Sequence, residues 1–163
     1  MLALSTAEAV WFLPAALPIG IFVAWNDMRA MKIPNIAVYA LLISFAVLGL
    51  FALPFDEYLW GYVHLIVVLV IGIALNAIGA LGAGDAKFAA AAAPFIALAD
   101  LASLLYLFAG CLLSGYVIHR IVRASPLRRL VPDWESWKSG RRFPMGLPLA
   151  ATLILYLAMP FLA

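Results

Sequence analysis

Six apolar runs, separated by short polar breaks, make up most of this 163-residue chain. Hydrophobic residues account for 67% of the sequence and charged residues for 11%, and the mean hydropathy is +1.11. A water-soluble domain of this length needs a polar shell, and too few polar residues are present to build one. We therefore expect the apolar surface to face lipid and residues 1–163 to form a single membrane-embedded domain.

Each apolar run is a candidate transmembrane helix, because crossing the hydrocarbon core takes roughly 20 apolar residues. Turn-forming residues such as Pro, Gly and Asn occupy several of the breaks between the runs. The sequence thus predicts an all-α, polytopic bundle of six transmembrane helices. The expected spans are Ala9–Trp25, Ile36–Leu53, Leu59–Leu81, Phe88–Ala99, Leu101–Ile118 and Pro144–Leu162.

Basic residues are confined to three of the five breaks, which sets the expected orientation. Cytoplasmic loops of membrane proteins carry an excess of Lys and Arg. Six crossings with both termini on the non-cytoplasmic side place every basic residue in the cytoplasm. The ten basic residues are Arg29, Lys32, Lys87, Arg120, Arg123, Arg128, Arg129, Lys138, Arg141 and Arg142.

The stretch from Phe88 to Ile118 is short for two crossings. Its 31 residues extend about 46 Å as α-helix, whereas two passes through a core ~30 Å thick need more. A fourth helix that starts below the membrane surface resolves the conflict and leaves open whether that helix spans fully. Gly84 and Asp85 would then lie within the bilayer plane, where irregular backbone survives only inside protein or around a wet cavity. We therefore expect a cavity at Asp85.

Two aspartates stand at the cytoplasmic ends of predicted spans, Asp27 after the first and Asp85 before the fourth. An ionisable group at membrane depth is costly and indicates function. For Asp27 alone, however, an interfacial ion pair with Arg29 or Lys32 is the simpler interpretation. Gly82 and Gly84 allow close backbone approach or a positive φ beside Asp85, although a plain helix–helix turn with Asp85 as N-cap is equally open.

The aspartate pair is more informative than either aspartate, because the predicted topology places both on one membrane face. Two close carboxylates cannot both ionise, so one can take a proton from an attacking water while the other protonates the carbonyl oxygen. Such a pair hydrolyses a peptide bond without a metal. The chain has a single cysteine, Cys111, which excludes a CxxC zinc site. We expect neither a metal nor another cofactor.

Three stretches carry a resemblance to a known family. Residues 26–35 contain an Asp, an Arg two positions later and then Ile-Pro-Asn; residues 82–87 read Gly-Ala-Gly-Asp-Ala-Lys. These resemble the first signature and the GxGDxK element of the type IV prepilin peptidases, which are membrane aspartic proteases. The separation of 58 positions between the aspartates also fits. Residues 143–148 are similar to a Pro-Tyr-Gly-Pro-type stretch of the family, with Met145 where Tyr is usual.

The resemblance implies an aspartic endopeptidase of the bacterial inner membrane. It would remove a short basic leader from prepilin-like precursors at the cytoplasmic face, after a Gly, and work beside pilus assembly components. Larger relatives also N-methylate the new terminus with a module of paired CxxC motifs; here we expect the short form, as in tight-adherence (Flp) pilus systems, without methylation. Asp27 and Asp85 would be catalytic, and the supporting motif residues would be Arg29, Pro34, Asn35, Gly82, Gly84, Lys87, Pro144 and Gly146.

Two other classes of function stay open at this point. In a small transporter or channel component, Asp27 and Asp85 would form a proton or cation relay, although a relay favours carboxylates near the bilayer centre. The second class is a non-catalytic assembly protein of a secretion system, although such a role would not explain the presence of the two aspartates. The basic loop 120–142 is most simply a surface for anionic lipid headgroups. We set nucleic-acid binding aside for that loop, and a gating role stays open.

The predicted orientation can be tested with reporter fusions. A reporter inserted near Arg129 should read as cytoplasmic and one near Asp56 as external, because the basic loops stay on the cytoplasmic side. The reverse pattern would overturn the topology.

Overall fold

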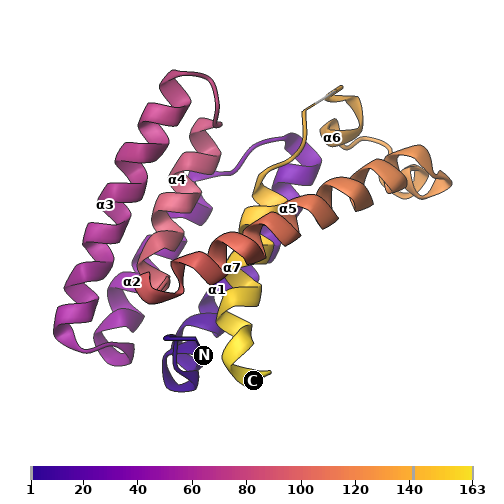
Figure 1. The fold of residues 1–163 in the computed structure, drawn as a ribbon. Coiled ribbons are helices and arrows are strands. Elements are labelled where there is room, and N and C mark those ends of the chain that lie inside the picture. The colour runs from indigo at the N-terminus through magenta and orange to yellow at the C-terminus, as the bar shows by residue number, and fades with distance from the viewer. Residues whose placement is uncertain (1, 141, 163) are drawn as a thin grey trace.

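A computed structural model describes residues 2–140 and 142–162, and all regular structure within these ranges is helical (Figure 1). The predicted all-α class is therefore confirmed. The helices are α1 Thr6–Ala30, α2 Asn35–Ala52, α3 Phe55–Ala77, α4 Ala83–Ala92, α5 Leu101–Ala124, α6 Glu135–Lys138 and α7 Gly146–Ala158, with 3-10 turns η1 Ala93–Phe95, η2 Leu98–Asp100, η3 Pro126–Leu130 and η4 Met159–Phe161.

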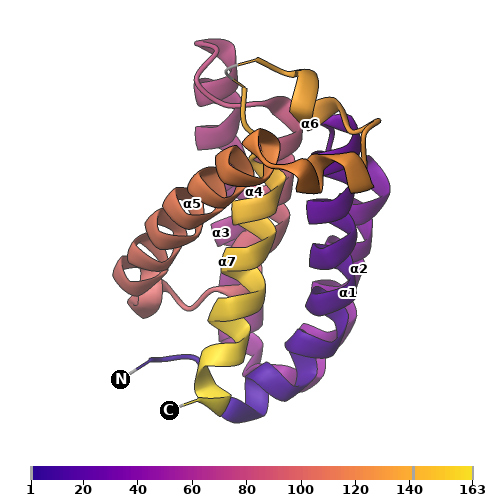
Figure 2. The same ribbon diagram turned by 90° about the vertical axis from the view of Figure 1, so that its right-hand side faces the viewer.

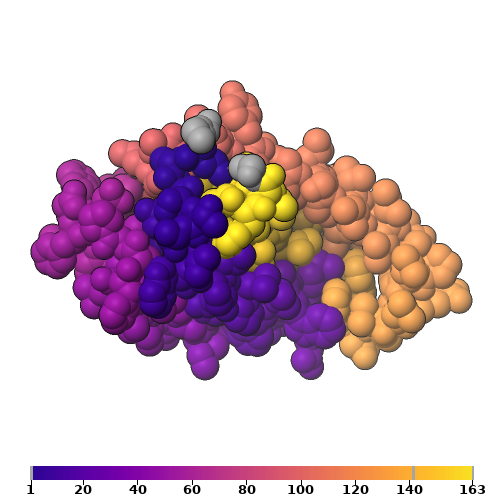
Figure 3. Space-filling view, turned by 90° about the horizontal axis from the view of Figure 1, so that it is seen from below, coloured from indigo at the N-terminus to yellow at the C-terminus, as the bar shows by residue number. Residues whose placement is uncertain are grey.

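The helices α1 to α5 alternate in direction and α7 runs opposite to α5, so the start of α1 and the end of α7 lie at the same end of the bundle (Figures 1 and 2). Figure 3 views that end directly, with these two segments side by side. Four helices are long and apolar enough to cross a membrane: Thr6–Ala30, Asn35–Ala52, Phe55–Ala77 and Leu98–Ala124. Gly146–Phe161 is apolar but shorter. Six crossings and the sidedness of the termini stay predictions.

The bounds predicted for the fourth span are wrong. We expected a helix over Phe88–Ala99, but α4 covers Ala83–Ala92, includes Asp85 in its first turn and has Gly82 as its N-cap residue. Pro94 has no backbone N–H to continue the α-helix and lies in η1. The ten residues of α4 extend about 15 Å, so α4 alone is too short to cross a hydrocarbon core ~30 Å thick.

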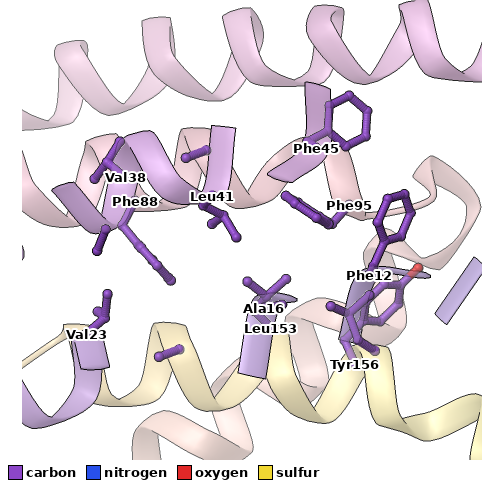
Figure 4. Packing of buried hydrophobic residues seen from close by; sticks show 14 of the residues in the cluster. Phe12, Ala16, Val23, Val38, Leu41, Phe45, Phe88, Phe95, Leu153 and Tyr156 are labelled. Carbon is purple, nitrogen blue, oxygen red and sulfur yellow. The ribbon is translucent and has the colours of Figure 1, made fainter. Parts of the chain in front are cut away.

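The hydrophobic core follows α1, which packs between α2 and α7. Figure 4 shows the core from Val23 at one end to Phe12 and Tyr156 at the other. Phe12 meets Phe95 edge to face with ring centroids 5.0 Å apart, a favoured aromatic geometry. The fully buried Ala16 keeps the interface between α1 and α7 narrow, because its side chain is a single methyl group.

Local hydrogen bonds define both ends of α1, and so the position of Asp27. Ser5 and Glu8 form a capping box at the start of the helix. At the other end, Met31 adopts a left-handed φ of 53°, and its N–H donates to the carbonyl of Asp27 over 2.8 Å. Pro14 and Pro18 interrupt the hydrogen-bond ladder and account for the bend of α1 in Figure 2. Asp27 therefore stands on the last turn of the first helix.

A buried carboxylate ties three segments together at the end of the bundle where the chain begins. Asp100 is 3% exposed and accepts hydrogen bonds from the N–H groups of Ala3 (2.7 Å) and Leu4 (3.0 Å). It also accepts one from the Tyr156 hydroxyl (2.8 Å), which in turn accepts one from the Ala97 N–H (3.1 Å). The segment before α1, the α4–α5 connection and α7 are joined in this way.

Asp100→Asn should destabilise the protein, because an amide group would face hydrogen-bond donors that now bind a carboxylate. Loss of these charge-assisted bonds costs about 2–3 kcal/mol. Thermal unfolding of the purified protein in detergent measures the effect as a lower midpoint. Asp56→Asn, at an exposed carboxylate in the first turn of α3, is the matched control and should change stability by less than about 0.5 kcal/mol. Equal midpoints for the two variants would contradict the role of Asp100.

Candidate active site

The two aspartates line one pocket, at the end of the bundle opposite the chain termini. The pocket has a volume of about 640 Å³. Its walls come from Asp27 on α1, the connection 31–33, the turn and first helical residues 79–85, and residues 142, 143 and 145 before α7. The cavity predicted at Asp85 is therefore present. Parts of the chain that are far apart in the sequence converge on it.

Asp27 lies on the inner side of this pocket and is 5% exposed. Its Oδ2 accepts a hydrogen bond of 2.6 Å from the backbone N–H of Gly146, the first residue of α7. Asp85 lines the same pocket. The carboxyl group of Asp27 thus has a fixed orientation and shares its pocket with a second acid.

Gly146 stands where no larger residue fits without movement. A Cβ at this position would lie 2.9 Å from both the Cβ and the Oδ2 of Asp27, closer than real Cβ atoms pack. The preceding Pro144 is fully buried, which fixes the backbone that leads to this contact. The segment similar to the third family stretch therefore meets the first signature directly. The sequence alone had not defined a role for residues 143–148.

Asp85 is half-buried and projects from the first turn of α4. Its Oδ2 lies 2.5 Å from the point that a Cβ on Gly82 would occupy, so the carboxyl group folds back over the Gly82 backbone. Gly82 has an ordinary φ of −67°, and close approach explains the glycine here. The interpretation of Asp85 as the N-cap is wrong, since that position belongs to Gly82. Gly84 packs beside Ile33, in the connection that carries the first motif.

Of the supporting motif residues, Gly82 and Gly84 line the pocket, whereas the others lie outside its lining. Lys87 donates a hydrogen bond of 3.4 Å from its Nζ to Oδ1 of Asn35 and so links the two signatures. Pro34 is the N-cap residue of α2. Arg29 is exposed and lies outside the pocket lining. An ion pair of Arg29 with Asp27, one form of the simpler interpretation of that aspartate, receives no support from this arrangement.

The sequence left a gating role of the basic loop open, and the end of this loop does line the pocket. Trp134 meets Trp25 of α1 edge to face at 5.1 Å, and Trp137 stacks on the buried His119 of α5 at 5.0 Å. These contacts hold the loop against the bundle. Arg142 and Phe143 then line the pocket beside the aspartates. The only sequence signal for this was their position next to the third motif.

Within the described residues, no group of three or more His, Cys, Asp or Glu side chains is arranged to hold a metal ion. The polar side chains of the pocket lining are the two carboxyl groups and the basic residues Lys32 and Arg142. The fold and this pocket define an all-helical membrane-type protein with a pair of acids at one end of the bundle.

A family model described as the type IV leader peptidase family matches residues 14–118, which is more than half of the chain. The chain belongs to this family, whose members are proteases. The predicted family is thereby confirmed. The matched segment contains both Asp27 and Asp85 and ends before Gly146. No curated protein and no solved structure matches the chain significantly.

Gly146→Ala should impair peptidase activity, because the added methyl group would displace Asp27 or the N–H that binds it. A displacement of about 1 Å at a reacting group costs on the order of 100-fold in rate. The matched control is Gly115→Ala on α5, where the nearest atom to a new Cβ would be Phe143 Cζ at 3.5 Å, an ordinary contact. Cleavage rates of the two variants, measured at equal membrane abundance, should differ by at least about tenfold. Similar rates would mean that the contact of Gly146 with Asp27 does not matter for activity.

Proposed function

We propose that the chain is an aspartic endopeptidase that removes the basic leader from prepilin-like precursors. The observation that carries this proposal is the presence of Asp27 and Asp85 in the lining of one pocket. Membership of the type IV leader peptidase family supports the substrate class. Cleavage would occur after a Gly, at the cytoplasmic face of the bacterial inner membrane.

The chemistry proposed for the pocket needs only two carboxyl groups and a water molecule. With one carboxyl protonated and one ionised, the ionised group takes a proton from water as the water attacks the scissile carbonyl carbon. The protonated group donates its proton to the carbonyl oxygen. When the tetrahedral intermediate collapses, a proton passes to the leaving amide nitrogen and the C–N bond breaks. Because the two groups share a proton, they titrate as a pair.

The Gly146 N–H prepares Asp27 for this reaction. It holds Oδ2 in one orientation and stabilises negative charge on that oxygen. A group positioned before substrate enters loses little entropy in reaching the reactive geometry. Gly146 thus acts as a positioning residue for Asp27. Pro144, Asn35 and Lys87 would support the same arrangement through the backbone segments that they fix.

Peptidase activity without N-methylation is the form of the enzyme that we propose. The single cysteine of this chain, Cys111, lies on α5 and is buried. One cysteine cannot provide the paired CxxC motifs of the methylating relatives. The new amino terminus of the processed pilin would therefore leave this site unmodified.

The proposal is tested by co-expressing the chain with a prepilin-like precursor and following the size of the precursor on a gel. Asp27→Asn and Asp85→Asn should each lower cleavage by at least about 100-fold, because each removes one partner of the acid–base pair. The exposed Asp133→Asn, in the basic loop outside the pocket lining, is the matched control and should cleave at the wild-type rate. Metal chelators should have no effect.

Normal cleavage by either pocket variant, inserted at wild-type abundance, would show that the carboxyl pair is not catalytic. An uncut precursor in the wild-type sample would favour the competing function of a proton relay.

A further inference from the structure

A second cavity lies at the other end of the bundle, far along α1 and α3 from the aspartate pair. Its volume is about 450 Å³, within the range typical of small-ligand sites. The buried rings of Phe12 and Phe95 form part of its wall, together with other apolar residues. Glu57 and Trp60 line it as well and are exposed. The cavity thus runs from an apolar interior to a polar rim.

The charge of the rim is entirely negative. Glu8 and Glu57 line the cavity, and no Lys or Arg does. The basic residues that the structure describes lie toward the opposite end, in or just after the last turn of α1, in the last turns of α5, in the first half of α4 and in the segments between α5 and α7. A cation at the rim would meet two carboxylates, and its attraction to them is strengthened by the apolar wall behind them. The cavity is therefore electrostatically complementary to a positively charged group attached to an apolar body.

Trp60 indicates the depth of the cavity in the membrane. It is 60% exposed on the first half of α3, a helix apolar enough to span the bilayer. Exposed Trp residues of membrane proteins concentrate at the membrane–water boundary. The rim would then stand at the level of lipid headgroups, and the apolar wall at the level of the first acyl carbons.

From these three features we infer that the cavity binds a phospholipid with a primary ammonium headgroup, the ethanolamine class. The ammonium group binds Glu8 and Glu57, and one acyl chain lies against Phe12 and Phe95. His64, also in the lining, offers a ring N–H donor to the phosphate. This site is separate from the peptidase pocket and takes no part in the cleavage chemistry.

The test uses the purified full-length chain in uncharged detergent micelles, titrated with phospholipids that carry bromine on their acyl chains. Bromine quenches nearby Trp fluorescence, and subtracting the response of a Trp60→Phe variant isolates Trp60. Phosphatidylethanolamine and phosphatidylglycerol with identical brominated chains are compared. Half-quenching of the Trp60 fluorescence should need about fivefold less phosphatidylethanolamine than phosphatidylglycerol. Partly exposed ion pairs contribute on the order of 1 kcal/mol, which corresponds to this ratio.

The double variant Glu8→Gln/Glu57→Gln should lose this preference while retaining the fold, because Gln also serves at the third position of a capping box. Asp56→Asn is the matched control: Asp56 neighbours Glu57 in the first turn of α3 but lies outside the cavity lining, and this variant should keep the preference.

Equal quenching of the wild-type protein by the two lipids would overturn the inference. So would a preference that survives in the double variant, or one that disappears with Asp56→Asn. The readout needs no precursor protein, so its result does not depend on whether the peptidase assignment holds.

Discussion

The first and last helices approach closely enough at one end of the bundle for the Gly146 N–H to reach the Asp27 carboxylate over 2.6 Å. This contact requires a residue without a side chain at position 146, and it requires narrow packing along α1 and α7. Ala16 and Ala150, both fully buried, provide small side chains along these helices. The geometry of the aspartate pocket depends on that approach, since Phe143 and Met145 enter the lining with the same segment.

The two ends of the bundle carry opposite chemistry. At one end, basic residues flank the aspartate pocket, and Trp134 and Trp137 hold the basic loop against α1 and α5 by aromatic contacts. At the other end the charges are acidic, and Asp100 joins the start of the chain to α7. Charge asymmetry of this kind orients a membrane protein.

The short α4 shows how a site can be placed at one end of a helical bundle. Its N-cap is Gly82, whose lack of a side chain leaves room for the carboxyl group of Asp85, and the helix ends shortly before Pro94. Gly72 on α3 lets the two helices pack closely, because a Cβ there would lie 2.9 Å from the Cβ of Ala86. Asp85 is thereby carried by a short helix anchored on a long one. Hydropathy predicted that an apolar segment exists here but placed its start after Asp85, because apolar composition does not register a glycine N-cap or a polar first turn.

The sequence by itself determined the helical class, the approximate position of the long helices and the two aspartates as candidates, because hydropathy and turn chemistry act over a few neighbouring residues. It also carried the signatures that placed the chain in its family. Only the tertiary structure decided that Gly146 orients Asp27, a contact across 119 positions, that Lys87 reaches Asn35, and that Asp100 accepts hydrogen bonds from two other segments, residues 3–4 and α7. Such contacts depend on how helices pack against one another, and packing is set by side chains that are distant in the chain.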